Sequence, residues 1–328
     1  MKDERFISVN PPKASYSHKD PRITLTPSHY VYVKIAEGCK NKCSYCAIYK
    51  IRGDFRSRPI ASILSEIRIL SSKRKIPELN IIAQDTTSYG IDIAKTPQIV
   101  ELLKKICSIK AAHWIRLLYT HPKYFTDELI DIIAEEPSIC KYIDIPIQHI
   151  NNDILKKMNR KVTRERIEVL IKKIRKKIPN VALRTSIIVG FPGETDKQFK
   201  ELCDFIKKTK FERLGCFIYS KEEDTPAYNL KNQIDAKVKK IRFDKIMQLQ
   251  QKVSEEINSA LLGKDMEVLI EEKDPSQKGV YIARTEHDAP EVDGQVYVHT
   301  KKTLKPGELI NVTITDTLEY DLIAKTFN

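Results

Sequence analysis

The chain has 328 residues, of which 41% are apolar and 31% are charged, and it carries a formal net charge of +13. This supply of apolar residues is enough for one large domain and one small domain, so a disordered chain is excluded as the default. No stretch approaches the ~18 uninterrupted apolar residues of a membrane span, and the N-terminus lacks the apolar core of a signal peptide. We therefore expect a cytoplasmic protein that has no membrane partner.

The charge is divided unevenly along the chain. Residues 261–328 contain 8 Lys+Arg and 13 Asp+Glu, a net charge of −5, whereas residues 1–260 carry a net charge of +18. A basic segment can indicate a nucleic-acid partner, but a chain rich in lysine can also be basic through its background composition. The change of sign predicts that the two parts face different partners.

Residues 1–28 are polar, contain four prolines and show no sustained apolar period, which predicts a linker or tail. Residues 29–260 then alternate short apolar runs with amphipathic stretches six times. This alternation predicts an α/β fold in which parallel strands form a partial, six-unit β/α barrel and helices cover its outer face. The expected strands lie in YVYVKI, LNIIAQ, WIRLLYT, YIDIPIQ, VALRTSIIVG and RLGCFIYS, and the expected helices lie near residues 60–73, 98–109, 126–135, 163–177, 195–208 and 235–260.

The helical pattern stops at about residue 261. The segments MEVLIEE, GVYIAR, GQVYVH and ELINVTITD follow one another, with turn residues such as Asp293-Gly294 and Pro306-Gly307 between them. Residues 261–328 are therefore expected to form a small antiparallel β-barrel. The two domains should meet near residues 258–262, at the end of the last long helix.

Three cysteines, Cys39, Cys43 and Cys46, crowd into eight residues directly after the first predicted strand. Gly38 allows a tight turn before them, so the backbone can fold around a metal group. If the thiolates hold a four-iron, four-sulfur cube, the fourth iron has no protein ligand and can bind a small molecule through an amine and a carboxylate. S-adenosylmethionine offers both groups. The alternative is a zinc-stabilised scaffold, but a structural zinc site needs four ligands and the sequence has no second cysteine pair.

The remaining cysteines are scattered singly and have no cluster spacing. An odd number of cysteines with three in one motif fits reduced thiols that bind metal better than it fits disulfides. We interpret the isolated ones as small buried hydrophobic residues. They are Cys107, Cys140, Cys203 and Cys216.

Polar side chains and a glycine follow the ends of other predicted strands. In a β/α barrel the carboxyl ends of the strands share one rim, where the chemistry takes place, so these residues should lie close to Cys39. These rim residues are Gln84, Asp85, Gln148 and Gly190, and the candidate catalytic residues are Gln84, Asp85, Gln148 and, within the strand VALRTSIIVG, Arg184. For Arg184 the alternative is a buried arginine that pairs with a carboxylate, and His149 is equally compatible with a structural histidine.

A Cys-x3-Cys-x2-Cys motif after a strand, followed by six β/α units, resembles the radical S-adenosylmethionine superfamily. The resemblance implies that Tyr45 lies near the adenine of the cofactor. It also implies that Gly190, Phe191 and Pro192, within IVGFPGE, contact the adenine and ribose. The two glycines of this segment allow a close backbone approach, and Thr195 and Gln198 have capping-box spacing for the helix that follows.

The segments HYVYVKIAEGCKNKCSYCAI, RSRPI, AQDTTSYG, DIPIQH, GFPGET and IMQLQQ are similar to the methylthiotransferases of this superfamily, and the C-terminal barrel resembles their TRAM domain. Two branches are possible: enzymes that modify an aspartate of ribosomal protein S-twelve, the RimO group, and enzymes that modify an adenosine of transfer RNA. The segments AQDTTSYG, DIPIQH and APEVDGQVYV resemble the RimO group more closely. An acidic barrel agrees with this choice, because a domain that grips RNA should be basic.

The resemblance implies an enzyme that adds a methylthio group to the β-carbon of an aspartate in ribosomal protein S-twelve. One S-adenosylmethionine methylates a sulfur, and another is cleaved to a 5′-deoxyadenosyl radical that removes hydrogen from the substrate carbon. An electron donor such as a flavodoxin or ferredoxin is implied as a partner. The barrel contributes position and the exclusion of water.

Family members begin with a further domain whose own cysteines hold a second four-iron, four-sulfur cluster, and the ligands of that cluster are missing here. The chain is expected to start in the linker after that domain. Sulfur insertion is therefore expected to need a separate sulfur-carrying domain, and the alternative is a fragment that cleaves S-adenosylmethionine without inserting sulfur.

Overall fold

The structure of the protein is a computed structural model that describes residues 16–327. Six parallel strands form two three-stranded sheets with the orders β1-β4-β5 and β6-β7-β8. The sheets meet at β5 and β6, where the backbone of Thr120 donates to Asp144 O at 3.2 Å. The predicted six-unit partial barrel is therefore confirmed. The strands are β1 (Tyr30–Lys34), β4 (Ile76–Ile82), β5 (Ala112–Leu117), β6 (Tyr142–Asp144), β7 (Ala182–Val189) and β8 (Arg213–Ile218).

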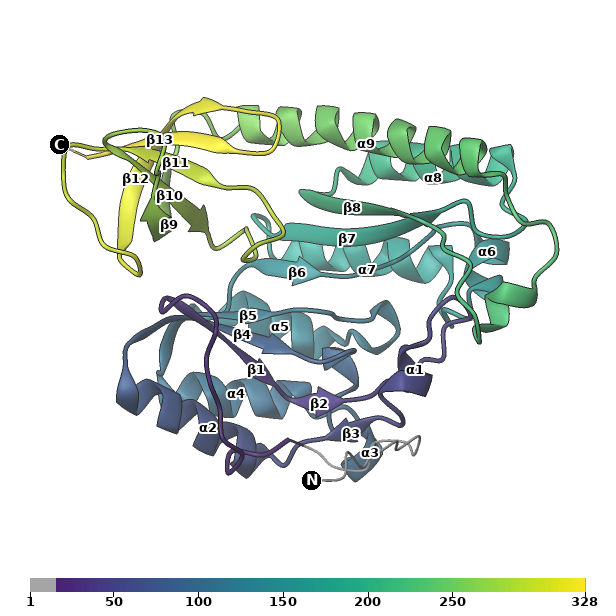
Figure 1. The fold of residues 1–328 in the computed structure, drawn as a ribbon, viewed down its shortest axis with the longest axis horizontal. Helices are drawn as coiled ribbons and strands as arrows, with labels where there is room; N and C mark the ends of the chain where they lie inside the picture. The colour runs from purple at the N-terminus through teal and green to yellow at the C-terminus, as the bar shows by residue number, and fades with distance from the viewer. Residues whose placement is uncertain (1–15, 328) are drawn as a thin grey trace, which may run out of the picture.

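Each strand is followed by a helix that covers the outer face of the sheets (Figure 1). Threonine side chains accept the first free N–H groups of three of these helices, at Thr126, Thr163 and Thr195, and Thr195 and Gln198 form the predicted capping box. The observed bounds lie within a residue or two of the predicted ones. The helices are α2 (Ile60–Lys73), α4 (Ile99–Ile109), α5 (Asp127–Glu135), α7 (Arg164–Lys177), α8 (Asp196–Thr209) and α9 (Ala236–Ser259).

Short elements that the sequence did not indicate lie mainly near the ends of the strands. β2 and β3 pair antiparallel around the cysteine segment. A turn of 3-10 helix follows β4, and another lies in the long connection between β8 and α9. The short elements are β2 (Ala36–Glu37), α1 (Ile48–Ile51), β3 (Arg56–Ser57), η1 (Thr86–Ser88), α3 (Ile91–Ala94), η2 (Pro122–Tyr124), α6 (Asn152–Lys157) and η3 (Pro226–Asn229).

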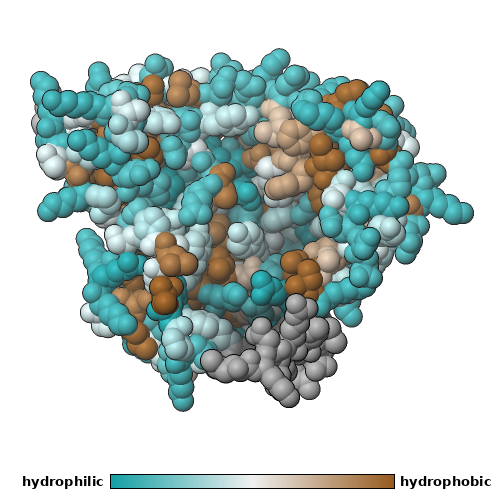
Figure 2. All heavy atoms as spheres, viewed as in Figure 1, coloured by the Kyte–Doolittle hydropathy of each residue, from teal (hydrophilic) through white to brown (hydrophobic). Residues whose placement is uncertain are grey.

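The strands separate an apolar outer layer from a polar interior. In β4, Leu79 and Ile81 belong to the main hydrophobic core, whereas Glu78 and Asn80 are fully buried polar residues. Successive side chains of a strand point to opposite faces, so Glu78 and Asn80 face the inside of the partial barrel. In Figure 2 the surface between the two halves of the molecule is recessed.

The C-terminal domain is a closed barrel with the strand order β10-β11-β13-β12-β9. The prediction of an antiparallel barrel is wrong for one pair, because β11 and β13 run parallel. A closed barrel with an odd number of strands cannot alternate direction at every pair, and the fifth strand, β13, was not predicted. The strands are β9 (Asp265–Lys273), β10 (Val280–Thr285), β11 (Val296–His299), β12 (Leu309–Thr317) and β13 (Leu322–Thr326).

The loop between β10 and β11 of the C-terminal domain reaches the amino ends of the strands of the partial barrel (Figure 1). Tyr30 OH, in edge strand β1, donates to Glu291 Oε1 at 2.6 Å, and Arg213 Nε, in edge strand β8, donates to Asp288 Oδ1 at 2.9 Å. One loop therefore ties both edges of the open barrel to the C-terminal domain.

A part of the predicted N-terminal linker packs against the barrel domain. Tyr16 OH donates to Glu66 Oε1 of α2 at 2.8 Å, and Arg22 pairs with the same carboxylate. Residues 1–15 of the predicted linker lie outside the described residues. No helix within residues 16–327 is both long enough and apolar enough to cross a membrane.

Candidate cluster and cofactor site

The three motif cysteines lie in one loop between β2 and α1, at the carboxyl end of β1. Cys43 is buried, and Cys39 and Cys46 are half-buried. Gly38 has a φ of +80°, and a Cβ there would lie 2.2 Å from Asp54 O, so only glycine fits this turn. The tight turn predicted before the first cysteine is confirmed.

Hydrogen bonds from several other segments fix this cysteine loop. Asn41 Nδ2 donates to Asp85 Oδ2 at 2.7 Å, which links the loop to the end of β4. Ser44 N donates to Met158 O at 3.0 Å, and Ala227 N donates to Ser44 O at 2.8 Å. The loop is therefore held by the segments after β4, β6 and β8, and its sulfurs have little freedom to move.

The cysteine sulfurs match the donor set of a cube with one open iron. Burial raises the pKa of Cys39 to about 11 and raises the pKa of Cys46 as well, so metal binding must displace protons from both thiols. Among residues 16–327, no three His, Cys, Asp or Glu side chains are close enough together to hold a single ion. A cube does not require that closeness, because each thiolate binds a different iron.

A buried arginine contacts the cysteine loop at Cys43. Arg160 Nη1 donates to Cys43 Sγ at 3.6 Å, and Arg160 Nη2 donates to Pro146 O. Arg160 is 5% exposed. No sequence pattern indicates this residue, because it follows a short helix and belongs to no motif.

The predicted adenine-contacting residues come together beside the cysteine loop. Tyr45 packs against a cluster that contains Phe191 and Tyr219, whose rings lie 5.4 Å apart in an edge-to-face arrangement. Burial raises the pKa of the Tyr45 phenol. The half-buried Tyr45, from the cysteine loop, and the fully buried Phe191, after β7, therefore belong to one apolar cluster at the carboxyl rim.

A buried carboxylate shapes the turn at Gly190, Phe191 and Pro192. Gly190 has a φ of +73°. Glu194 Oε2 accepts from Gly190 N at 2.6 Å and from Phe191 N at 3.2 Å, and Glu194 Oε1 pairs with Arg242 Nη1 at 3.1 Å. The resemblance placed Glu194 in the contact segment but did not predict that its carboxylate holds the turn, and it did not indicate Arg242. The role of the glutamate could have been noticed, because it directly follows Gly193 in GFPGE, but Arg242 is distant in the chain.

The polar candidates at the rim have different surroundings. Asp85 is buried and accepts from Asn41 Nδ2, Thr87 Oγ1, Ser88 N and Ser88 Oγ. Gln84 Nε2 donates to Glu37 Oε1 at 2.9 Å. The side chain of Gln148 is half-buried and its backbone has a φ of +71°. Asp85 thus has the hydrogen bonds of a structural carboxylate, whereas Gln148 has no side-chain partner within the described residues.

His149 and Arg184 match the structural alternatives considered from the sequence. Burial lowers the pKa of His149 to about 3, so its ring is neutral, and its Nδ1 accepts from Asn151 N at 3.0 Å. Arg184 pairs with Asp144 at 3.1 Å and with Asp293 of the C-terminal domain at 3.4 Å. It lies near the start of β7, about 20 Å along the strand from Gly190 at ~3.3 Å per residue.

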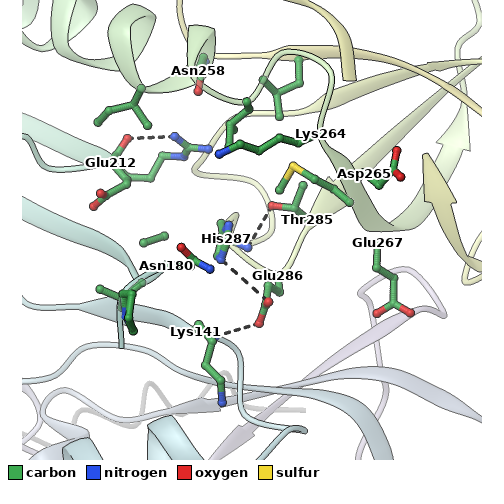
Figure 3. A pocket seen from close by; sticks show the side chains of 18 of the residues that line it. Lys141, Asn180, Glu212, Asn258, Lys264, Asp265, Glu267, Thr285, Glu286 and His287 are labelled. Atoms are coloured by element: carbon green, nitrogen blue, oxygen red, sulfur yellow. Dashed lines mark hydrogen bonds and ion pairs between the residues drawn. The ribbon is translucent and has the colours of Figure 1, made fainter. Parts of the chain in front are cut away.

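A separate cavity of about 490 Å³ lies between the two domains (Figure 3). Lys141 and Glu286 lie side by side on its wall, where Lys141 N donates to Glu286 Oε2 at 2.9 Å. Asn258, Lys264 and His287 also line it. None of the predicted site residues lines this cavity, so it is distinct from the cysteine rim.

Residues 33–206 match the Radical SAM superfamily, and residues 262–326 match the TRAM domain. The fold agrees with that of coproporphyrinogen III oxidase (HemN) from Escherichia coli, with a TM-score of 0.52 and 16% identity over 70% of this chain and 53% of that chain. The partial barrel, the cysteine loop at its carboxyl rim and the closed C-terminal barrel together define a radical SAM enzyme with a TRAM domain.

Closer relatives narrow this class. The chain is 48% identical to ribosomal protein uS12 methylthiotransferase RimO from Desulforamulus reducens, over 94% of this chain and 70% of the relative. It is also 48% identical to the protein of that name from Clostridioides difficile, over 97% of this chain and 71% of the relative. The chain belongs to the RimO branch of the radical SAM methylthiotransferases and is a transferase, which confirms the predicted branch.

Proposed function

We propose that this enzyme holds one four-iron, four-sulfur cluster on Cys39, Cys43 and Cys46 and binds S-adenosylmethionine beside it. Its reaction is the transfer of a methylthio group to the β-carbon of an aspartate in ribosomal protein uS12, the S-twelve protein named above. The support for this substrate is the name shared by the relatives at 48% identity. The support for the site is one observation: Tyr45 of the cysteine loop and Phe191 after β7 belong to a single apolar cluster.

The bound cluster and cofactor supply the radical that removes hydrogen from the substrate carbon, while the chain supplies position. In this proposal the half-buried Tyr45 packs against the adenine, and the backbone of Phe191 and Pro192 lies along it, because the Phe191 side chain is fully buried. Gly190 allows the backbone to approach the ribose, and Glu194 holds that turn through the N–H groups of Gly190 and Phe191. The half-buried Gln148 is free to donate to substrate or cofactor.

The charge of the C-terminal domain favours a basic protein over RNA as the partner. Residues 261–328 carry a net charge of −5, which would repel phosphate groups and attract lysine and arginine. The proposed reaction also needs two partners. One is an external electron donor, such as a flavodoxin or ferredoxin, and the other is a sulfur-carrying domain with a second cluster.

The experiment starts with anaerobic reconstitution and a count of iron and sulfide. We expect about four irons per chain, as one cube needs. After reduction in the presence of S-adenosylmethionine, 5′-deoxyadenosine should form. The C43A variant should lose both iron and this product, whereas C107A, which replaces an isolated cysteine of α4, should keep both.

The substrate is tested separately with isolated uS12 and with transfer RNA, each analysed for an added methylthio group by mass spectrometry. Modification of uS12 supports the proposal, and modification of transfer RNA alone would overturn the choice of substrate. Cofactor cleavage without sulfur insertion would agree with the expected need for a separate sulfur-carrying domain. Retention of zinc in place of iron under anaerobic conditions would overturn the site itself.

A further inference from the structure

Arg160 differs from the other buried arginines of the molecule in its partners. Within residues 16–327, the other arginines of comparable burial each form an ion pair with a carboxylate, and no carboxylate lies within ion-pair distance of Arg160. These paired arginines are Arg58 with Glu66, Arg116 and Arg284 with Glu78, and Arg242 with Glu194.

An unpaired buried charge is costly, because the protein interior replaces the hydration of the ion poorly. The polar contacts of the Arg160 guanidinium are Pro146 O and Cys43 Sγ, and neither belongs to a carboxylate. A cube held by three thiolates carries a net negative charge, so a loaded cluster supplies a counter-charge in contact with Arg160, where residues 16–327 place no carboxylate within ion-pair distance. The surroundings of Arg160 are therefore those of a residue that balances an anion at Cys43.

We propose that Arg160 is a positioning residue of the cluster, and that its N–H donation to the Cys43 sulfur raises the reduction potential of the cube. This inference rests on the proposed function. One-electron reduction by an external donor adds a negative charge to the cube, and a buried cation with an N–H···S bond stabilises the reduced form more than the oxidised form. The residue thus makes the cluster easier to reduce.

The test is a potentiometric titration of the anaerobically reconstituted chain without S-adenosylmethionine, with dithionite as reductant and the cluster followed by electron paramagnetic resonance. In R160Q the midpoint potential should shift to a more negative value at an unchanged iron and sulfide content. In K161Q, which removes an exposed charge from the neighbouring residue, the potential should stay at the native value because water screens that charge.

The conservative variant R160K keeps the charge but loses the planar pair of donors, so a smaller negative shift is expected. If R160Q holds fewer irons than the native chain, R160K becomes the deciding variant. An unchanged midpoint potential in R160K would then overturn the role of the hydrogen bond. An unchanged potential in fully loaded R160Q would overturn the proposal as a whole. Failure of the native chain to assemble a cluster would instead refute the proposed function, so the two failures are distinguishable.

Discussion

Gly190 and Gly263 share a left-handed backbone but differ in their surroundings. Gly190 has a φ of +73°, and a Cβ there would lie 2.4 Å from Lys239 Cγ. Gly263 has a φ of +77°, and nothing lies within 4 Å of its added Cβ. Replacing Gly263 with alanine therefore costs backbone strain alone, whereas replacing Gly190 with alanine costs backbone strain and a steric clash.

In G190A we expect weaker binding of S-adenosylmethionine, by about tenfold for each ~1.4 kcal/mol of strain at the turn. Lys239 must also move away, which breaks its bond to Tyr219 O at 3.0 Å. In G263A the free energy of unfolding should fall by about 1–2 kcal/mol, the cost of a left-handed alanine, and cofactor affinity should not change. Isothermal titration and urea unfolding measure both quantities, and equal affinities for the two variants would contradict the role of Gly190.

Single residues also show where the sequence was and was not sufficient. Cys39, Cys43 and Cys46 could be selected from their spacing, because a local motif contains all the information needed. The sequence alone could not decide between a catalytic and a structural role for Arg184, because one of its two partners, Asp293, lies in the other domain. Arg160 and Arg242 depend on contacts between distant segments, for which a single sequence gives no signal.

The cysteine loop is an element without regular structure that depends on its neighbours for its shape. Asn41 in the loop bonds to Asp85, and Asp85 also accepts from Thr87 and Ser88 in η1. The carboxylate thus joins two segments that follow different strands. This arrangement favours a structural role for Asp85, whereas the sequence favoured a catalytic one.

The D85N variant distinguishes a structural role of Asp85 from a catalytic one. An amide has one acceptor oxygen in place of two, so at least one buried donor loses its partner, at a cost of about 1–3 kcal/mol. We expect a lower free energy of unfolding and fewer irons per chain after anaerobic gel filtration. D127N, at an exposed position at the start of α5, should change stability by less than ~0.5 kcal/mol. A D85N protein with native stability and iron content but no 5′-deoxyadenosine would instead assign Asp85 to catalysis.

The helices were predictable because each repeats an apolar face and three begin at a threonine cap. The strands of the partial barrel were predictable because they are nearly continuous apolar runs. β13 was missed, since Leu322–Thr326 is short and follows a polar segment, and its pairing with β11 requires barrel closure. Short elements such as α6 and η3 were missed because tertiary contacts stabilise them.

At the scale of the whole molecule, a buried ionic network joins the two domains. Glu78 of β4 is fully buried and pairs with Arg116 of β5 and with Arg284 of β10, each at 2.6 Å. Burial acts to raise the pKa of Glu78, but the two guanidinium groups outweigh it and hold this pKa below its ordinary value. Neither the partners of Glu78 nor its burial could be predicted from the sequence, because the pairing spans two domains.

The sign of this pKa shift predicts how acid affects the interface. A carboxylate whose pKa is lower in the folded state contributes stability above its ordinary pKa, near 4.5, and this contribution is lost as the pH falls through the folded value. The E78Q variant leaves two buried guanidinium groups without this partner, so we expect a loss of about 3–5 kcal/mol at neutral pH. The variant should also lose less stability than the native chain when the pH is lowered below about 4.5.

Urea unfolding of the native chain, E78Q and E267Q between pH 7 and pH 3 tests this network. Glu267 pairs with His113 on the surface, where both side chains are more than a third exposed, so E267Q should cost no more than ~1 kcal/mol. Because Arg284 lies in the C-terminal barrel and Arg116 in the partial barrel, the loss in E78Q should appear as separate unfolding of the two domains. A single transition at the native midpoint would show that the apolar contacts of Trp114, Leu269 and Ala289 hold the domains together without the ionic network.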